Sequence, residues 1–241
     1  MLQRVVLCDR IAIEPADLLG VEGFEGDTIV RAALVALAVA AGVEPLWAAR
    51  IWKSIPVAAG LGGGSSDAAT ALRLANGLLP TPLAPHELEQ LAATIGADVP
   101  FFLRNGPQLG TGDGSSLAPL ELPLDYSVVL VLPAGATKES TADVYRRFDE
   151  RAGAVGFAGR RAALLDTLAG IRRAVDLAGL PANDLASSAV ALDLVDRGAV
   201  RADVSGAGPT VYGLFLQRRH ADAAARALQA AGRTWVTRPC P

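Results

Sequence analysis

The chain has 241 residues, of which 51% are hydrophobic and 20% are charged, and its formal net charge is −3. This length allows one large domain or two small ones, with the composition of an ordinary globular protein. The slight negative charge provides no general attraction to nucleic acid or to an anionic membrane.

Cysteine and histidine are scarce in this sequence. Cys8 and Cys240 lie near opposite ends without metal-ligand spacing, so we expect free thiols in a reducing compartment. With only His86 and His220, neither a histidine-rich metal centre nor a Ser-His-Asp triad is expected. We find no signal peptide, and the longest uncharged apolar run, 32–43, is too short to span a bilayer. The sequence therefore predicts a cytoplasmic protein with no nucleic-acid or membrane partner.

The first predicted elements lead into a glycine-rich loop. Alternating apolar residues predict a strand over 5–14. An alanine-rich segment predicts a helix over 29–41 that ends at Gly42, because glycine readily takes the left-handed conformation of a helix end. A short strand is expected over 46–51, just before the loop.

The loop contains three adjacent glycines, which let the backbone approach a ligand closely. The glycines and the three preferred N-cap residues after them are Gly62, Gly63, Gly64, Ser65, Ser66 and Asp67. A helix that begins here directs unpaired N–H groups and the positive end of its dipole into the loop. Such a loop binds anions, and we expect a nucleotide phosphate. The alternative is a flexible turn before a well-capped helix.

Three other glycine-rich motifs do not fit the loop. A Walker A loop ends in Gly-Lys-Ser/Thr, whereas Ser-Ser-Asp follows the last glycine here. A dinucleotide fingerprint counted from Gly60 would need a third glycine where Ser65 stands. The protein-kinase triplets His-Arg-Asp and Asp-Phe-Gly are absent from the sequence.

The loop resembles the phosphate loop of the galactokinase–homoserine kinase–mevalonate kinase (GHMP) superfamily. Its triple glycine with Ser-Ser-Asp-Ala-Ala is most similar to the kinases that act on 4-diphosphocytidyl-2-C-methyl-D-erythritol. The resemblance implies an α+β, two-domain GHMP-kinase fold. In this implied fold, residues 1–122 form an N-terminal half like domain 2 of ribosomal protein S5, and residues 123–241 form a ferredoxin-like C-terminal half. The residues that would hold ATP are Lys53, Pro56, Val57, Ala58, Ala59, Gly60, Leu61, Gly62, Gly63, Gly64, Ser65 and Ser66. The alternative for Lys53 is a surface lysine.

A second segment bears on the chemistry. After a helix expected over 86–95 comes Gly-Ala-Asp-Val-Pro, in which Asp98 is the carboxylate. From the residues alone, a turn or cap aspartate explains Asp98 about as well as a functional one. In the resembled kinases this pentapeptide carries the catalytic aspartate, so the resemblance implies that Asp98 orients the acceptor hydroxyl and takes its proton.

The next part of the chain supplies candidate substrate residues. We expect a hairpin turn at 110–114 and a strand over 126–132. A helix then opens near Thr141, which lies four residues from Tyr145 and on the same helical face. Tyr145 is either a half-buried packing residue or, by the resemblance, the ring that stacks on the cytosine of the substrate.

The remaining elements follow in order. We expect a helix over 151–178, a capping turn at 181–185 and a helix over 221–231. Strands are expected over 200–204, 211–216 and 234–237. The connection 205–210 is either a plain hairpin or, by the resemblance, a glycine motif that packs beside the phosphate loop and lines the site.

The implied reaction is phosphoryl transfer from ATP, with Mg²⁺, to the 2-hydroxyl of a cytidyl diphosphate sugar alcohol. Metal ligands are unknown, and the protein is expected to be a monomer or a homodimer. The alternatives are a GHMP kinase for another small alcohol, such as mevalonate or homoserine, and a nucleotide-binding chain with little catalysis.

One segment departs from the resembled pattern. The resembled kinases begin with a strand bearing Ala-Lys-x-Asn and then an Asp-Gly-Tyr-His turn. Here no lysine precedes Lys53, and the first histidine is His86. We therefore expect the family's N-terminal strand to be lacking, either because Met1 is an internal methionine or because the chain is a shortened form with weak or no activity.

Overall fold

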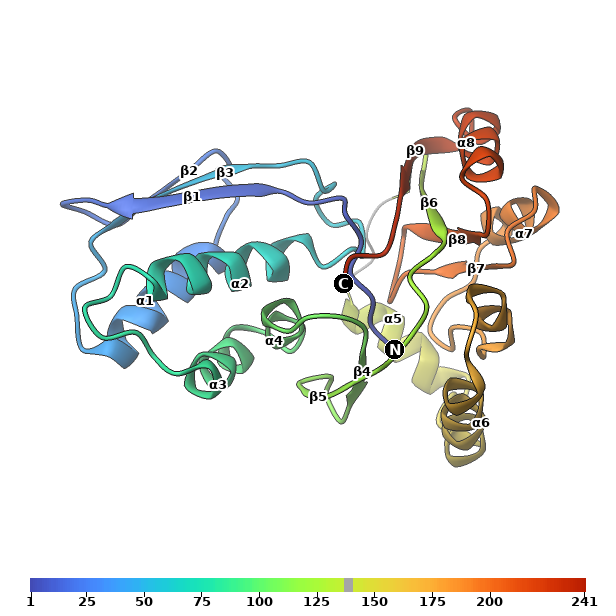
Figure 1. Ribbon diagram of the computed structural model, residues 1–241, viewed down its shortest axis with the longest axis horizontal. Helices are drawn as coiled ribbons and strands as arrows, with labels where there is room; N and C mark the ends of the chain where they lie inside the picture. Colours follow the sequence, from blue (N-terminus) through green and yellow to red (C-terminus); the bar gives the residue numbers. More distant parts are fainter. Residues whose placement is uncertain (137–140) are drawn as a thin grey trace. The chain divides into compact units, whose positions relative to one another are not determined.

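The computed structural model describes residues 1–136 and 141–241, with only the backbone described at 141 and 142. These residues form two compact units, both built from helices and strands (Figure 1). The first unit comprises 1–57, 62–120 and Pro241, and the second comprises 58–61 and 121–240. The glycine loop is thus shared, because its middle residues belong to the second unit.

A three-stranded sheet forms one layer of the first unit, with the strand order β1-β3-β2. β1 (Arg10–Pro15) runs antiparallel to β3 (Trp47–Trp52), and β2 (Gly20–Glu22) runs parallel to it. Burial alternates along β3, where Ile51 is buried while Trp52 is exposed. One face of the sheet therefore packs on the core and the other is open to solvent.

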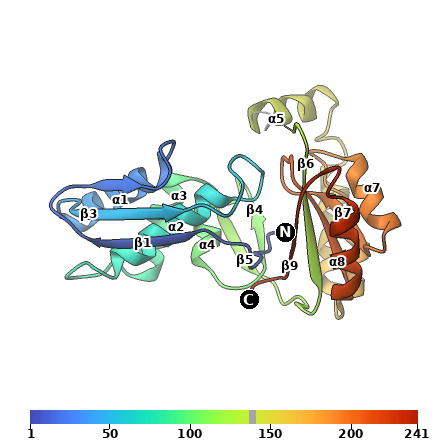
Figure 2. The same ribbon diagram turned by 90° about the horizontal axis from the view of Figure 1, so that it is seen from above.

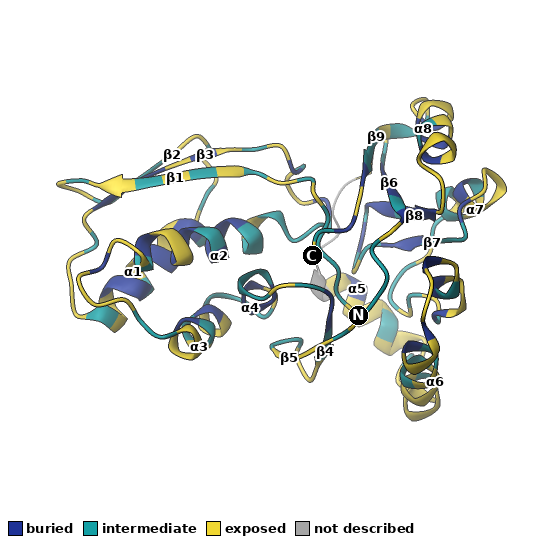
Figure 3. Ribbon diagram, viewed as in Figure 1, coloured by how far each residue is buried: buried dark blue, intermediate teal, exposed yellow. Residues whose placement is uncertain are grey.

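Helices lie on one side of this sheet (Figures 1 and 2). They are α1 (Ile29–Ala41), α2 (Gly63–Asn76), α3 (Pro85–Ile95) and α4 (Val99–Leu103). Their inner faces carry most of the buried side chains of this unit (Figure 3). The small alanine side chains of α2 let neighbouring backbones approach closely, and the core is completed by Val30, Leu34, Leu37, Leu72, Leu88 and Val99. A hairpin of β4 (Gln108–Thr111) and β5 (Ser116–Pro119) confirms the predicted turn at 110–114.

The second unit contains a four-stranded antiparallel sheet with the order β7-β8-β6-β9. Its strands are β6 (Ser127–Pro133), β7 (Arg201–Val204), β8 (Val211–Phe215) and β9 (Gly232–Thr237). Two helices, α7 (Ala189–Asp196) and α8 (Arg218–Ala227), pack on the sheet around Val129, Leu194 and Phe215 (Figure 2). The unit also holds α5 (Thr141–Glu150), α6 (Phe157–Gly170) and a 3₁₀ helix, η1 (Ala174–Gly179).

The bounds of two predicted elements are wrong. The helix expected over 151–178 is interrupted, because turns follow α5 and Gly156 takes a left-handed conformation (φ 77°) at the start of α6. The strand expected over 5–14 exists, but it begins only at Arg10. The preceding residue, Asp9, instead accepts hydrogen bonds from the amides of Ser54 and Ile55.

The expected capping turn at 181–185 does not cap a helix. Helix α7 begins at Ala189, and its N-cap is Ser188, whose hydroxyl oxygen accepts a hydrogen bond from the amide of Val190. The Asn183 side-chain amide instead donates to the carbonyl oxygens of Val204, at 2.9 Å, and Gly206, at 2.7 Å. Asn183 therefore supports the connection between β7 and β8.

Across the two described ranges, none of the helices combines the length and the apolar character needed to cross a bilayer.

Candidate active site

The glycine loop ends in a helix that begins earlier than its capping residues predict. Helix α2 starts at Gly63, and its N-cap is Gly62 in the left-handed conformation (φ 66°). The expectation that Ser65, Ser66 or Asp67 caps this helix is wrong, since all three lie inside it. Within the described part of the chain no side chain bonds the first amides of α2, so they remain available to an anion.

Gly60 needs its glycine because two backbone segments meet there. Its φ is 74°, and a Cβ at this position would lie 2.3 Å from the carbonyl oxygen of Gly208. The hydroxyl of Ser205 donates to the Gly60 carbonyl oxygen at 2.9 Å, and the Thr210 amide donates to the Ala59 carbonyl oxygen at 3.2 Å. The expectation that the 205–210 segment packs beside the phosphate loop is therefore confirmed.

Asp98 stands in the turn just before α4. Its carboxylate is exposed and does not cap that helix, and among residues 1–136 and 141–241 it has no hydrogen-bond or ion-pair partner. Helix α4 touches the loop, because a Cβ at Gly62 would lie 2.8 Å from the ring of Phe102. Asp98 is thus a free carboxylate carried by an element that packs on the glycine loop, which suits a group that acts on a bound substrate.

Lys53 is not a solvated surface lysine. Its ammonium lies 2.5 Å from a carboxylate oxygen of Asp9 and 2.7 Å from one of Asp67, and its side chain is 17% exposed. Burial acts to lower the pKa of Lys53, but the hydrogen bonds and charges of the two carboxylates outweigh it and raise this pKa. The three charged groups form a cluster, the Asp9–Lys53–Asp67 cluster, beside the first turn of α2.

The Asp67 carboxyl is the member of this cluster whose ionised form is disfavoured. Burial raises its pKa to about 6, with a contribution from the nearby Asp9 charge, although Lys53 acts in the opposite direction. Two carboxylates share one ammonium, so the ionised cluster carries a surplus negative charge. This arrangement keeps Lys53 charged and directs it to the start of α2.

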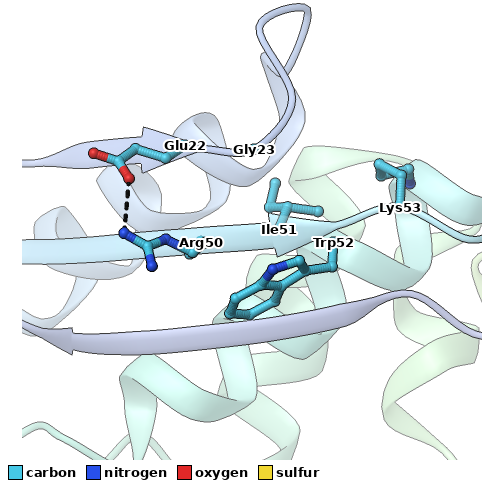
Figure 4. A pocket seen from close by; sticks show the side chains of 6 residues that line it. All are labelled: Glu22, Gly23, Arg50, Ile51, Trp52 and Lys53. Atoms are coloured by element: carbon cyan, nitrogen blue, oxygen red, sulfur yellow. Dashed lines mark hydrogen bonds and ion pairs between the residues drawn. The ribbon is translucent and has the colours of Figure 1, made fainter.

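A hollow of about 510 Å³ lies next to Lys53 (Figure 4). Glu22 and Arg50, which form an exposed ion pair at 3.2 Å, line it together with Gly23, Ile51, Trp52 and Lys53. The Trp52 ring is 43% exposed, and the Arg10 guanidinium lies over it, 5.2 Å from the ring centroid. The partly exposed Trp52 ring, with the Arg10 guanidinium over it, makes this hollow suitable for a flat, polar ligand.

The predicted substrate residues lie on α5. Thr141 is the first residue of α5, but its side chain lies outside the described part. Tyr145 is 52% exposed, so it is less buried than a core packing residue. Its role in stacking stays a prediction. No three His, Cys, Asp or Glu side chains in the two described ranges are placed to hold a metal ion, and metal ligands therefore stay unassigned.

Comparison with known proteins identifies the family. The GHMP kinases N terminal domain matches residues 27–106, and the GHMP kinases C terminal domain matches residues 189–234. The 4-diphosphocytidyl-2-C-methyl-D-erythritol kinases of Pelobacter propionicus and Streptomyces avermitilis are each 37% identical to this chain, over 98% of its length and 86% of theirs. The chain belongs to this family of GHMP kinases.

A solved structure agrees with this assignment. The crystal structure of a 4-(cytidine 5'-diphospho)-2C-methyl-D-erythritol kinase matches with a TM-score of 0.79 and 30% identity, covering 98% of this chain and 88% of that one. The predicted α+β GHMP-kinase fold is confirmed, and so is the prediction that the chain is a small-molecule kinase.

Two side chains of the cluster in this GHMP kinase, Asp9 and Asp67, are not among the site residues that the sequence predicts. The sequence pattern places Asp9 in a strand and Asp67 at a helix cap. A carboxylate inside a run of alternating apolar residues, as Asp9 is, signals a buried partner, because an unpaired buried charge is costly. The same signal marks Asp67, which precedes a run of alanines on a buried helix face.

Proposed function

We propose that this chain transfers the terminal phosphoryl group of ATP to the 2-hydroxyl of 4-diphosphocytidyl-2-C-methyl-D-erythritol, in the cytoplasm. The observation that carries the proposal is the start of α2, where unpaired amides face a glycine loop in a chain 37% identical to kinases named for this substrate. Phosphoryl transfer depends mainly on positioning and charge neutralisation, and both are available at this loop.

The loop residues 56–66 bind the phosphate groups in this proposal. The amides at the start of α2 donate hydrogen bonds to the phosphate oxygens, while Lys53 supplies the nearest described ammonium. The hollow that Lys53 lines offers Trp52 as a flat surface for the nucleotide base. Tyr145 and Thr141 would bind the cytidine end of the acceptor.

Asp98 orients the acceptor hydroxyl and receives its proton as the oxygen attacks phosphorus. Its exposed carboxylate has no ion-pair partner among the described residues, so it is free to accept a hydrogen bond from the substrate. Magnesium ions, which prefer oxygen ligands and retain several waters, neutralise phosphate charge when bound. The described residues offer no three-carboxylate cage for such an ion.

The test uses Asp98→Asn, which keeps the size of the side chain and removes its basicity. We expect ATP binding, measured by isothermal titration, to stay within about twofold and turnover in a coupled ADP-release assay to fall about 10²- to 10⁴-fold. Asp17→Asn, an exposed aspartate of the same unit, is the control and should keep full turnover. Unchanged turnover in Asp98→Asn would remove Asp98 from the chemistry.

The substrate is tested separately from the reaction. CMP should compete with the acceptor, whereas mevalonate and homoserine should not, since only CMP shares the cytidyl group. ATP binding without any phosphorylated product from 4-diphosphocytidyl-2-C-methyl-D-erythritol would instead indicate a nucleotide-binding chain without catalysis.

A further inference from the structure

The Asp9–Lys53–Asp67 cluster contains two carboxylates but only one ammonium, so its negative charge exceeds its positive charge when all three groups are ionised. The two carboxylate side chains are only 2% and 5% exposed, yet they share a single ammonium. Ionised carboxylates that are buried without full compensation are costly. The question is therefore what the second carboxylate does.

Asp9 and Asp67 are held in different ways. The Oδ1 atom of Asp9 accepts hydrogen bonds from two backbone amides, those of Ser54 at 2.5 Å and Ile55 at 2.8 Å. Asp9 is therefore anchored to the end of β3 independently of Lys53. Asp67 belongs to α2 and accepts from the Lys53 ammonium at 2.7 Å, so its charge is compensated through that contact.

The ammonium lies where phosphate is expected. A Cβ added to Gly63, the first residue of α2, would lie 3.6 Å from the Lys53 Nζ atom. Lys53 is therefore within reach of an anion bound to the first amides of this helix. Lys53 and Asp9 are the charged groups that act on Asp67 across this space.

We propose that Asp67 is a positioning residue that competes with the bound nucleotide for Lys53: it holds the ammonium at the start of α2 in the free protein and yields it to the phosphate groups on binding. The inference rests on the proposed function, because it assumes that phosphate binds at α2. Asp67 then lowers nucleotide affinity, because the Lys53–Asp67 contact must break when a nucleotide binds. Asp9 keeps the lysine in place throughout.

The first test measures ADP binding to the full chain, with Mg²⁺, by isothermal titration. Asp67→Asn removes the competing charge and keeps the shape, so we expect ADP to bind about five- to tenfold more tightly. Asp17→Asn removes an exposed charge from the same unit and should leave the affinity unchanged. Equal or weaker binding by Asp67→Asn would overturn the inference.

A double-mutant cycle separates this mechanism from a general charge effect. Lys53→Gln should weaken ADP binding, and adding Asp67→Asn to it should bring no further gain, because the competition acts through the ammonium. If Asp67→Asn raised the ADP affinity of the Lys53→Gln protein as much as it raises that of the wild type, the inference would be contradicted.

A second readout leaves Asp9, Lys53 and Asp67 unsubstituted. The sequence contains two lysines, Lys53 and Lys138, so a sample with isotope-labelled lysine side chains gives two ammonium signals in NMR. A Lys138→Arg sample assigns them. We expect the Lys53 signal to shift when ADP saturates the protein, and an unmoved signal would overturn the inference. If ADP does not bind to any form, the proposed function itself fails.

Discussion

The hydroxyl of Ser205 donates a hydrogen bond to the backbone carbonyl oxygen of Gly60 at 2.9 Å, across 145 residues of sequence. A second bond, from the Thr210 amide to the Ala59 carbonyl oxygen, lies beside it. Together they tie the glycine loop to the connection between β7 and β8. The conformation of the loop therefore depends on a segment late in the chain.

Removing the Ser205 hydroxyl should loosen the loop. We expect Ser205→Ala to lower the free energy of unfolding by about 1 kcal/mol, the usual contribution of one hydrogen bond. ATP affinity should fall several-fold, because the loop amides lose their fixed position. Urea unfolding and isothermal titration measure the two effects. Ser116→Ala, at an exposed position of β5, is the matched control and should change neither.

Two glycines of the loop should respond oppositely to alanine. In Gly60→Ala the added Cβ would lie 2.3 Å from the Gly208 carbonyl oxygen, and the residue would have to keep a left-handed φ. We therefore expect the free energy of unfolding to fall by at least about 2 kcal/mol. Gly64 lies inside α2, where the nearest atom to an added Cβ is 3.6 Å away, so Gly64→Ala should stabilise by about 0.5–1 kcal/mol. Urea denaturation of both variants decides this. A Gly60→Ala protein as stable as wild type would contradict the described loop geometry.

Protonation of Asp67 should make stability depend on pH. Its pKa rises from 3.8 to about 6 on folding, so the stabilisation from the bound proton is complete below pH 3.8 and is lost as pH rises through about 6. Asp67→Asn resembles the protonated form at every pH. We therefore expect its unfolding free energy to gain on wild type between about pH 4 and pH 7, by up to about 3 kcal/mol.

Denaturant unfolding at a series of pH values measures this difference. Asp17→Asn, which removes an exposed aspartate from the same unit, is the control variant measured alongside. A constant difference between wild type and Asp67→Asn would show that the Asp67 carboxyl has an ordinary pKa.

Tyr145 should act through its ring and not through its hydroxyl. Aromatic contacts contribute about 0.5–1.5 kcal/mol, so Tyr145→Ala should raise the KM for the cytidyl substrate about three- to tenfold. Tyr145→Phe should keep the wild-type KM. Because Tyr145 is 52% exposed, neither variant should lose much stability. A loss of stability in Tyr145→Ala with an unchanged KM would indicate a packing residue.

Local sequence determined several elements of this protein. Helix α1 has the predicted bounds, 29–41, because its apolar face, its alanines and the left-handed Gly42 at its end are all local features. The glycine loop and its amide-lined helix start were likewise recognisable, since triple glycine before a helix has few other uses. The predicted caps at Asp67 and Asn183 are wrong because each side chain has a distant partner that local rules do not consider, Lys53 for Asp67 and the Val204 carbonyl oxygen for Asn183.

Only the tertiary structure decided which charges meet. Lys53 lies 44 residues from Asp9 and 14 from Asp67 in the sequence, and Ser205 lies 145 from Gly60. Periodicity and capping rules report on neighbours a few residues apart, so they cannot pair such groups. The sequence by itself therefore determined most of the elements, the phosphate loop and the kinase family. The folded chain decided the partners of its buried charges, because burial penalises an unpaired charge wherever in the sequence its partner lies.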